Sequence, residues 1–118
     1  MKFTIFFDKS PYYKLKPHQT GYTPIEYRNT AVVRANQSEK EKWKTIFHES
    51  FHIRFHKFMV FFKKIGFEKM MDFLAELYAE NCMKRGKKFY DIKQYENEWK
   101  GWIIQDTDNL LDILRYLF

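Results

Sequence analysis

The first third of the chain alternates apolar and polar residues in short stretches. Residues 2–6, 22–27 and 31–35 are rich in aromatic and β-branched side chains, which is typical of half-buried strands. Residues 28–30 lie between the last two stretches and predict a hairpin turn. Residues 10–21 contain two prolines and a glycine and predict a loop. This part of the chain therefore predicts a small antiparallel sheet of about three strands.

A helical spacing replaces this alternation at Ser38. Ser38 and Glu41 match a capping box, in which each side chain satisfies a backbone N–H group of the other residue. Apolar residues then recur every three or four positions as far as Phe62, and Gly66 supplies a stop. The pattern predicts one continuous helix from Ser38 to about Phe62.

The rest of the chain predicts further helices. One runs from about residue 67 to 84 and ends before Gly86. Residues 91–94 resemble another capping box and predict a third helix, which Gly101 interrupts, and residues 106–108 then cap a short final helix. Strands followed by helices indicate an α+β fold. We expect one domain over 1–118, with three to four helices after the sheet.

The composition fits one globular domain in a reducing compartment. The 118 residues are 20% aromatic, which is enough bulky apolar surface for a single core. Cys82 is the only cysteine, so an intramolecular disulfide is excluded. Asp8 and Lys9 interrupt the N-terminal apolar residues too early for the apolar region of a secretory signal. No apolar run approaches the roughly 20 residues that a membrane span needs. We therefore expect a cytoplasmic protein without a membrane partner.

Residues 48–52 read His-Glu-Ser-Phe-His, inside the first predicted helix. Residues four apart lie on one helix face about 6 Å apart along the axis, so His48 and His52 can reach one zinc ion at roughly 2.0–2.1 Å. Glu49 is then placed to act on a metal-bound water as general base. The alternative interpretation is a pair of surface or core-lining histidines that hold no metal.

A zinc site of this kind needs a third protein ligand. His56 extends the histidine series, but a continuous helix would place it about 12 Å from His48, so we expect a supporting or structural role. Asp72, Glu76 and Glu80 share one face of the next predicted helix. Glu76 is the predicted ligand, because its apolar neighbours indicate a packed position where an unpaired carboxylate is costly. Asp72 and Glu80 stay open as the third ligand, and if Glu76 takes that place they are expected to orient the histidines.

A family resemblance adds to this prediction. Residues 31–52 combine a strand, a short turn, a capped helix and the H-E-x-x-H motif, and they resemble the ImmA/IrrE-type minimal gluzincins. Residues 76–81 are similar to the E-x-x-A segment of that family. The resemblance covers about residues 31–83, and it implies a phage or mobile-element setting in which such proteins cleave a regulator. It also implies a zincin-like domain in which His48, His52 and Glu76 are the zinc ligands. Glu49 is then the general base.

The sequence therefore predicts a small zinc metallopeptidase that cleaves a protein or peptide. The strand at 31–35, taken as a sheet edge, would hold an extended substrate by strand addition. Phe51 precedes His52 where the family usually has a small residue. This departure favours an alternative function, a non-catalytic inhibitor or binding protein of phage or mobile-element origin on the same scaffold.

The charge balance bears on the partner. A net charge of +6 and a pI near 9.3 suit an acidic protein or nucleic acid. Residues 84–88 form a basic cluster before two aromatic residues, which is the arrangement that nucleic-acid contacts use. The same charges also suit the C-terminal end of a helix. We expect a protein or peptide partner, with an acidic one favoured over nucleic acid.

Overall fold

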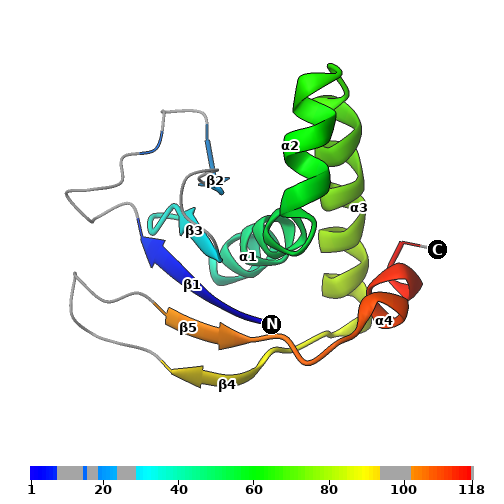
Figure 1. Cartoon of the computed structure of the whole chain (residues 1–118). Coiled ribbons are helices and arrows are strands. Elements are labelled where there is room, and N and C mark those ends of the chain that lie inside the picture. The colour runs from blue at the N-terminus through cyan, green and yellow to red at the C-terminus, as the bar shows by residue number, and fades with distance from the viewer. Residues whose placement is uncertain (8–14, 16–18, 24–28, 94–101, 118) are drawn as a thin grey trace.

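The described residues form a five-stranded sheet on one side of the molecule (Figure 1). The structure is a computed structural model, and it describes residues 1–7, 15, 19–23, 29–93 and 102–117. The strand order across the sheet is β2-β3-β1-β5-β4. The strands are β1 (Lys2–Phe7), β2 (Gly21–Tyr22), β3 (Thr30–Val33), β4 (Tyr90–Lys93) and β5 (Trp102–Gln105).

The sheet is mixed, since β1 pairs in parallel with β3 and antiparallel with β5. β2 pairs antiparallel with β3, and β4 pairs antiparallel with β5. The expectation of about three antiparallel strands is wrong in these details, because two C-terminal segments join the N-terminal strands. The predicted strand at 22–27 lies mostly outside the described residues. Asn29, in the predicted turn, has a left-handed φ of 53°, as turn residues often do.

Three helices of the described chain follow the three N-terminal strands, and a fourth follows β5, which confirms the α+β class. α1 starts where the capping box predicted, and the Ser38 side chain accepts the backbone N–H of Glu41. Gly86 ends α3 in the left-handed conformation, as glycine commonly does after a helix. The helices are α1 (Glu39–Arg54), α2 (His56–Lys64), α3 (Glu68–Arg85) and α4 (Leu110–Arg115).

Three sequence predictions about helices differ from the structure. The continuous helix to Phe62 is wrong, because Phe55 has φ −104° and ψ 31° and separates α1 from α2. The third helix is wrong at its start, where residues 90–93 form β4, and residues 94–101 lie outside the described chain. The last helix is capped by Asn109 and Asp112 rather than by residues 106–108.

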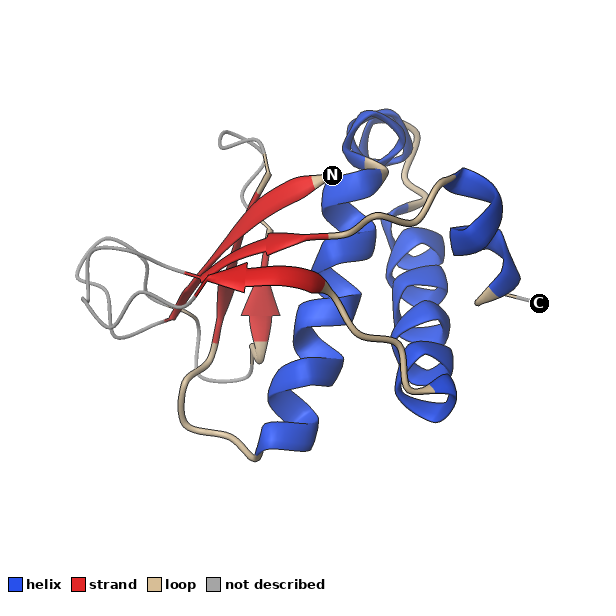
Figure 2. Ribbon diagram, turned by 90° about the horizontal axis from the view of Figure 1, so that it is seen from below, coloured by secondary structure: helices blue, strands red, loops and turns tan. Residues whose placement is uncertain are grey.

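The layers are the sheet, α1 on one face of it, and α3 on the far side of α1 (Figures 1 and 2). α2 and the first half of α3 run side by side and project away from the sheet (Figure 1). Fully buried side chains from all three layers form the core, among them Phe3, Ile5, Val33, Ile46, Phe47, Ala75 and Tyr78. α1 is therefore held from both sides, by the sheet and by α3. Among the described residues, no helix is both long and apolar enough to cross a membrane.

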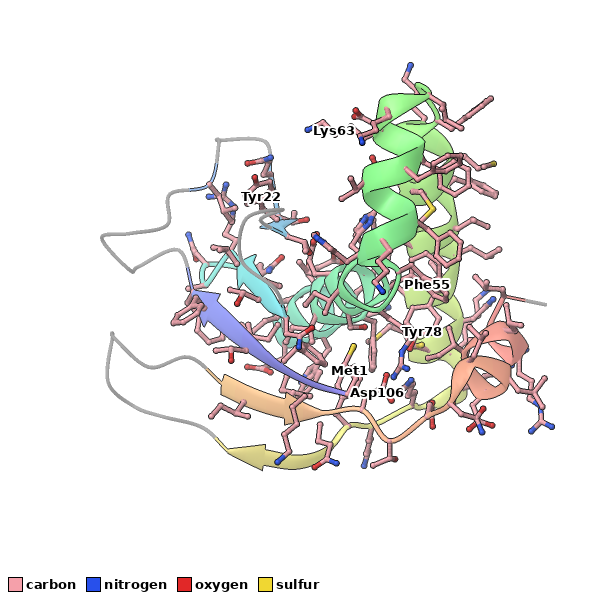
Figure 3. The ribbon with its side chains drawn as sticks, in the orientation of Figure 1. Met1, Tyr22, Phe55, Lys63, Tyr78 and Asp106 are labelled. Carbon is pink, nitrogen blue, oxygen red and sulfur yellow. The ribbon has the colours of Figure 1, made fainter. Side chains whose placement is uncertain are left out.

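A buried ammonium group joins the end of α3 to the segment after β5. Lys87 Nζ donates to the Tyr78 hydroxyl at 2.7 Å and lies 3.2 Å from Asp106 Oδ2 and 2.7 Å from Asp108 Oδ2. Only 4% of the Lys87 side chain is exposed, and Figure 3 shows Tyr78 of α3 near Asp106. Lys87 is thus part of the interior, which removes one cation from the basic cluster considered for nucleic acid.

Candidate metal centre

His48 and His52 lie one turn apart on α1 and turn the same ring atoms toward each other. The two Nε2 atoms are 3.2 Å apart. His52 is buried, whereas 21% of the His48 side chain is exposed. The helical spacing of the motif thus produces the convergence that the sequence predicted.

Asp72 reaches these histidines from α3. Its Oδ1 lies 3.0 Å from His52 Nε2. One potential ligand atom from each of His48, His52 and Asp72 lies within 4.8 Å of the other two. Asp72 comes from the predicted acidic face, although the sequence assigned it to orienting a histidine.

Glu76 contacts the opposite ring nitrogen of His48. Glu76 Oε2 lies 3.0 Å from His48 Nδ1, and its other oxygen, Oε1, lies 2.7 Å from Lys44 Nζ. Burial acts to raise the pKa of Glu76, but the hydrogen bonds from Lys44 and His48 outweigh it and leave this pKa lowered. Both oxygens of Glu76 are therefore engaged by protein groups. Its assignment as a zinc ligand stays a prediction, and the contacts favour Asp72 for that place.

The surroundings of His52 keep its ring neutral. Burial, and then the nearby His48, lower the pKa of His52 to about 4. Among the described residues its buried Nδ1 atom has no hydrogen-bond partner, while Nε2 faces His48 and Asp72. A neutral imidazole with one nitrogen pointed at other donor atoms is the form that binds a metal ion.

Glu49 is buried beside the sheet, on the other side of the motif. Its Oε2 accepts a hydrogen bond from Thr23 Oγ1, directly after β2. Burial raises the pKa of Glu49, although the charge of His48 and the Thr23 hydrogen bond both oppose that shift. The carboxylate predicted as a general base is therefore fixed in position and more basic than an exposed glutamate.

Gly21 allows β2 to lie against α1 at this point. A Cβ atom on Gly21 would stand 2.5 Å from Thr45 Cγ2 and 3.1 Å from Glu49 Oε1. The first of these distances is shorter than real side-chain contacts allow. The missing side chain therefore brings the backbone of β2 within reach of the Glu49 carboxylate.

A cleft of about 590 Å³ opens above these residues. Residues 19–23 form one wall, α1 forms the floor, and the end of α2 with the start of α3 forms the other wall. Tyr22 and Lys63 mark the two sides in Figure 3. All four predicted site residues line the cleft, together with Asp72: these are His48, Glu49, His52 and Glu76.

β2, and not β3, provides the sheet edge at this cleft. β3 is paired on both sides, by β2 and by β1. The expected edge strand at 31–35 is therefore wrong as an edge, because Gly21 and Tyr22 cover it. In the described chain the outer edge of the sheet on this side belongs to β2.

Other candidate residues lie outside the group. Glu80 Oε1 stands 3.9 Å from Lys44 Nζ, and His56 starts α2 beyond the break at Phe55. Phe51 points into the core, where its ring centre is 4.7 Å from that of Phe55, and it does not line the cleft. The Phe51 side chain therefore takes no space in the described cleft.

Three residues of the centre had no motif in the sequence. Thr23 lies 26 positions before Glu49 and Lys44 lies 32 before Glu76, so their pairing depends on tertiary structure. Asp72 was identified as a candidate only through its helical spacing from Glu76. Comparisons with protein families, with curated proteins and with solved structures gave no match. The functional argument therefore rests on this geometry.

Proposed function

We propose that the protein is a zinc-dependent peptidase whose ion is held by His48, His52 and Asp72. The observation that carries the proposal is the convergence of these three donors in a cleft, with a buried carboxylate at Glu49. Two imidazoles and one carboxylate form a common donor set of catalytic zinc sites, which keep further coordination positions for water and substrate. This proposal is an inference from the residues, and so is the phage or mobile-element setting that the family resemblance implies.

The distances fit that donor set. Bonds of about 2.0–2.1 Å in a tetrahedral site place two ligand nitrogens about 3.3 Å apart. The His48 and His52 Nε2 atoms are 3.2 Å apart, and Asp72 Oδ1 is 3.0 Å from His52 Nε2. Glu76 accepts a hydrogen bond from His48 Nδ1. This bond fixes the ring and leaves Nε2 as the nitrogen that binds the metal ion.

The remaining residues supply positioning and proton transfer. Zinc, when bound, lowers the pKa of a coordinated water and polarises a peptide carbonyl. Thr23 holds Glu49 Oε2, and Glu49 Oε1 is the atom that takes a proton from water and passes it to the leaving amine. Lys44 holds the far oxygen of Glu76 and so keeps that carboxylate ionised.

The outer edge of β2 is the surface where an extended peptide would bind. Gly21 and Tyr22 pair with β3 on one side only in the described chain, and both line the cleft. An extended segment adds to such an edge through backbone hydrogen bonds. The substrate class is thus a protein or peptide.

The compartment that we propose is the cytoplasm, and the free, buried thiol of Cys82 is in keeping with its reducing conditions.

Metal analysis of the purified protein tests the ligand set. We expect one zinc per chain in the wild type and loss of zinc in His52→Ala and Asp72→Asn. Glu80→Gln is the matched control, since it removes a charge from the same helix face outside the group, and it should keep the zinc. Glu76→Gln should still bind zinc, but about 10- to 100-fold more weakly. Zinc-free wild-type protein would exclude the proposal.

Hydrolysis assays with peptide mixtures then separate peptidase from binding protein. Glu49→Gln should keep the metal and abolish cleavage, because the amide cannot accept the proton. Stoichiometric zinc without cleavage in the wild type, or an unchanged biological effect of Glu49→Gln, would instead assign the chain to the non-catalytic binding alternative. If Glu76→Gln loses zinc while Asp72→Asn keeps it, the ligand roles of the two carboxylates are exchanged.

A further inference from the structure

The projecting α2–α3 pair carries a group of exposed apolar side chains. Phe58 and Phe61 are 58% and 56% exposed, and Phe73 is 66% exposed. Single exposed apolar residues are ordinary, but a contiguous set marks a contact surface. We call this set the apolar tip, and its members are Phe58, Phe61, Ile65, Phe67, Met70 and Phe73.

The tip is part of the folded protein and not a loosely attached segment. On α2, positions 58, 61 and 65 follow the three- and four-residue spacing of one helix face. Phe62, between them in sequence, is half-buried and packs edge-on against Phe67 with ring centres 6.4 Å apart. The exposed rings therefore stand on a supported helix pair that projects beyond the sheet (Figure 1).

Charge on the tip is one-sided. α2 contains Lys57, Lys63 and Lys64 and no acidic residue. The acidic side chains at the start of α3, Glu68 and Asp72, line the cleft. Lys57 and Lys64 are exposed and do not line it, and a helical wheel places both beside the apolar face. The outer side of the tip thus joins exposed aromatic rings to positive charge.

This combination selects among possible occupants. A second copy of the chain would bring the same lysines together across a two-fold interface, where like charges oppose association. An amphipathic helix with aromatic residues on one side and lysines beside them is instead suited to the interface of an anionic bilayer, where the lysine stems reach the headgroups.

We propose that the apolar tip docks on the surface of an anionic lipid bilayer. The rings of Phe58 and Phe61 enter the headgroup boundary, and Lys57 and Lys64 contact lipid phosphates. This is peripheral binding and needs no membrane-spanning helix. The proposal revises the expectation of a protein without a membrane partner, and it does not depend on a metal ion in the cleft.

Vesicle sedimentation with the full chain tests this proposal. We expect binding to vesicles of phosphatidylcholine with phosphatidylglycerol, little binding to phosphatidylcholine alone, and weaker binding at high salt. Phe61→Ser with Ile65→Ser should weaken binding about tenfold or more, because the variant has lost two apolar side chains that are removed from water when the wild type binds. Leu111→Ser is the matched control, since Leu111 is 58% exposed on α4, away from the tip, and it should bind like the wild type.

A fluorescent probe reports the depth of the contact. Phe61→Trp should shift its emission to the blue with anionic vesicles and be quenched by brominated acyl chains, whereas Leu111→Trp should show neither change. The opposite outcome is that the double variant Phe61→Ser with Ile65→Ser binds as tightly as the wild type while Lys57→Glu with Lys64→Glu loses binding. That result would show a contact through charge alone and overturn the docking of the rings. Absence of binding to anionic vesicles would also overturn it. A dimer in solution that Phe61→Ser dissociates would assign the tip to contact between copies.

Discussion

Two glutamates of the candidate site have opposite surroundings. Glu49 is buried against β2, and burial raises its pKa. Glu76 is 45% exposed in its side chain, and its bonds to Lys44 and His48 lower its pKa. Carboxylates separated in this way take different tasks. Glu49 is suited to exchanging a proton, while Glu76 stays charged and orients the histidine ring.

The close approach at Gly21 gives a prediction at the same scale. Gly21→Ala should destabilise the protein by about 1–3 kcal/mol, because the new Cβ overlaps Thr45 Cγ2. The free energy of unfolding in urea measures this effect. Thr45→Ser removes the overlapping methyl and keeps the hydroxyl that donates to Glu41 O.

A double-mutant cycle makes the prediction specific. Gly21→Ala should cost less in the Thr45→Ser background than in the wild type, by about 0.5 kcal/mol or more. An equal cost in both backgrounds would show that the strand shifts instead of pressing on Thr45. Zinc content in the same variants reports whether the ligands on α1 have moved.

At the scale of single residues, the sequence was informative where the chemistry is local. His48, Glu49 and His52 follow from a five-residue motif on one helix, and the structure places all three at the cleft. Thr23 and Lys44 could not be found, because their partners are more than 25 positions away. Choosing between Asp72 and Glu76 requires knowing how α3 is rotated against α1.

The elements differ in how much their own sequence determines them. α1 and α3 have apolar spacing and a serine cap or a glycine stop. The start of α1 and both ends of α3 were predicted within a few residues, whereas the end of α1 at Phe55 was not. β4 was predicted as a helix start, because a capping-box pattern over four residues says nothing about pairing with β5. The parallel pairing of β1 with β3 is likewise set by tertiary structure and has no local signal.

The end of α3 provides a prediction for one element. Gly86 has φ 66°, and a Cβ there would have nothing within 4 Å. Gly86→Ala should therefore cost about 1 kcal/mol from backbone strain alone. Gly86→Asn should cost less, since asparagine tolerates the left-handed conformation. Urea denaturation measures both variants, and an unaffected Gly86→Ala protein would contradict the left-handed end of α3.

Across the whole molecule, the Lys87 cluster connects segments that are far apart in sequence. Arg54 Nη2 lies 3.3 Å from Asp106 Oδ2, so the end of α1 joins the same carboxylate as Lys87. The backbone of Asp106 also pairs with Met1, through Asp106 N to Met1 O at 2.8 Å. Asp106 thus holds the first strand, α1 and the end of α3 to the segment after β5.

Removing that ammonium should weaken the whole fold. Lys87→Met should lower the free energy of unfolding by about 3 kcal/mol, because Asp106 and Asp108 lose a buried counter-charge while Arg54 still pairs with Asp106. Lys88→Met is the control, since Lys88 is exposed and its change should stay within about 0.5 kcal/mol. Chemical denaturation of both variants measures the difference. Equal stabilities would show that the cluster is neutral to the fold.

The proposed ligands lie on α1 and α3, which pack against each other and are connected in sequence through α2. His52 is near the end of α1 and Asp72 near the start of α3, and all members of the apolar tip except Phe73 lie between them in sequence. One ion bound by both residues would close this segment into a loop, much as a covalent cross-link does. At an ion concentration 1,000 times the dissociation constant, such a clasp adds about 4 kcal/mol against unfolding. The segment that carries the exposed aromatic rings would then be the part of the chain whose opening is most sensitive to a chelator.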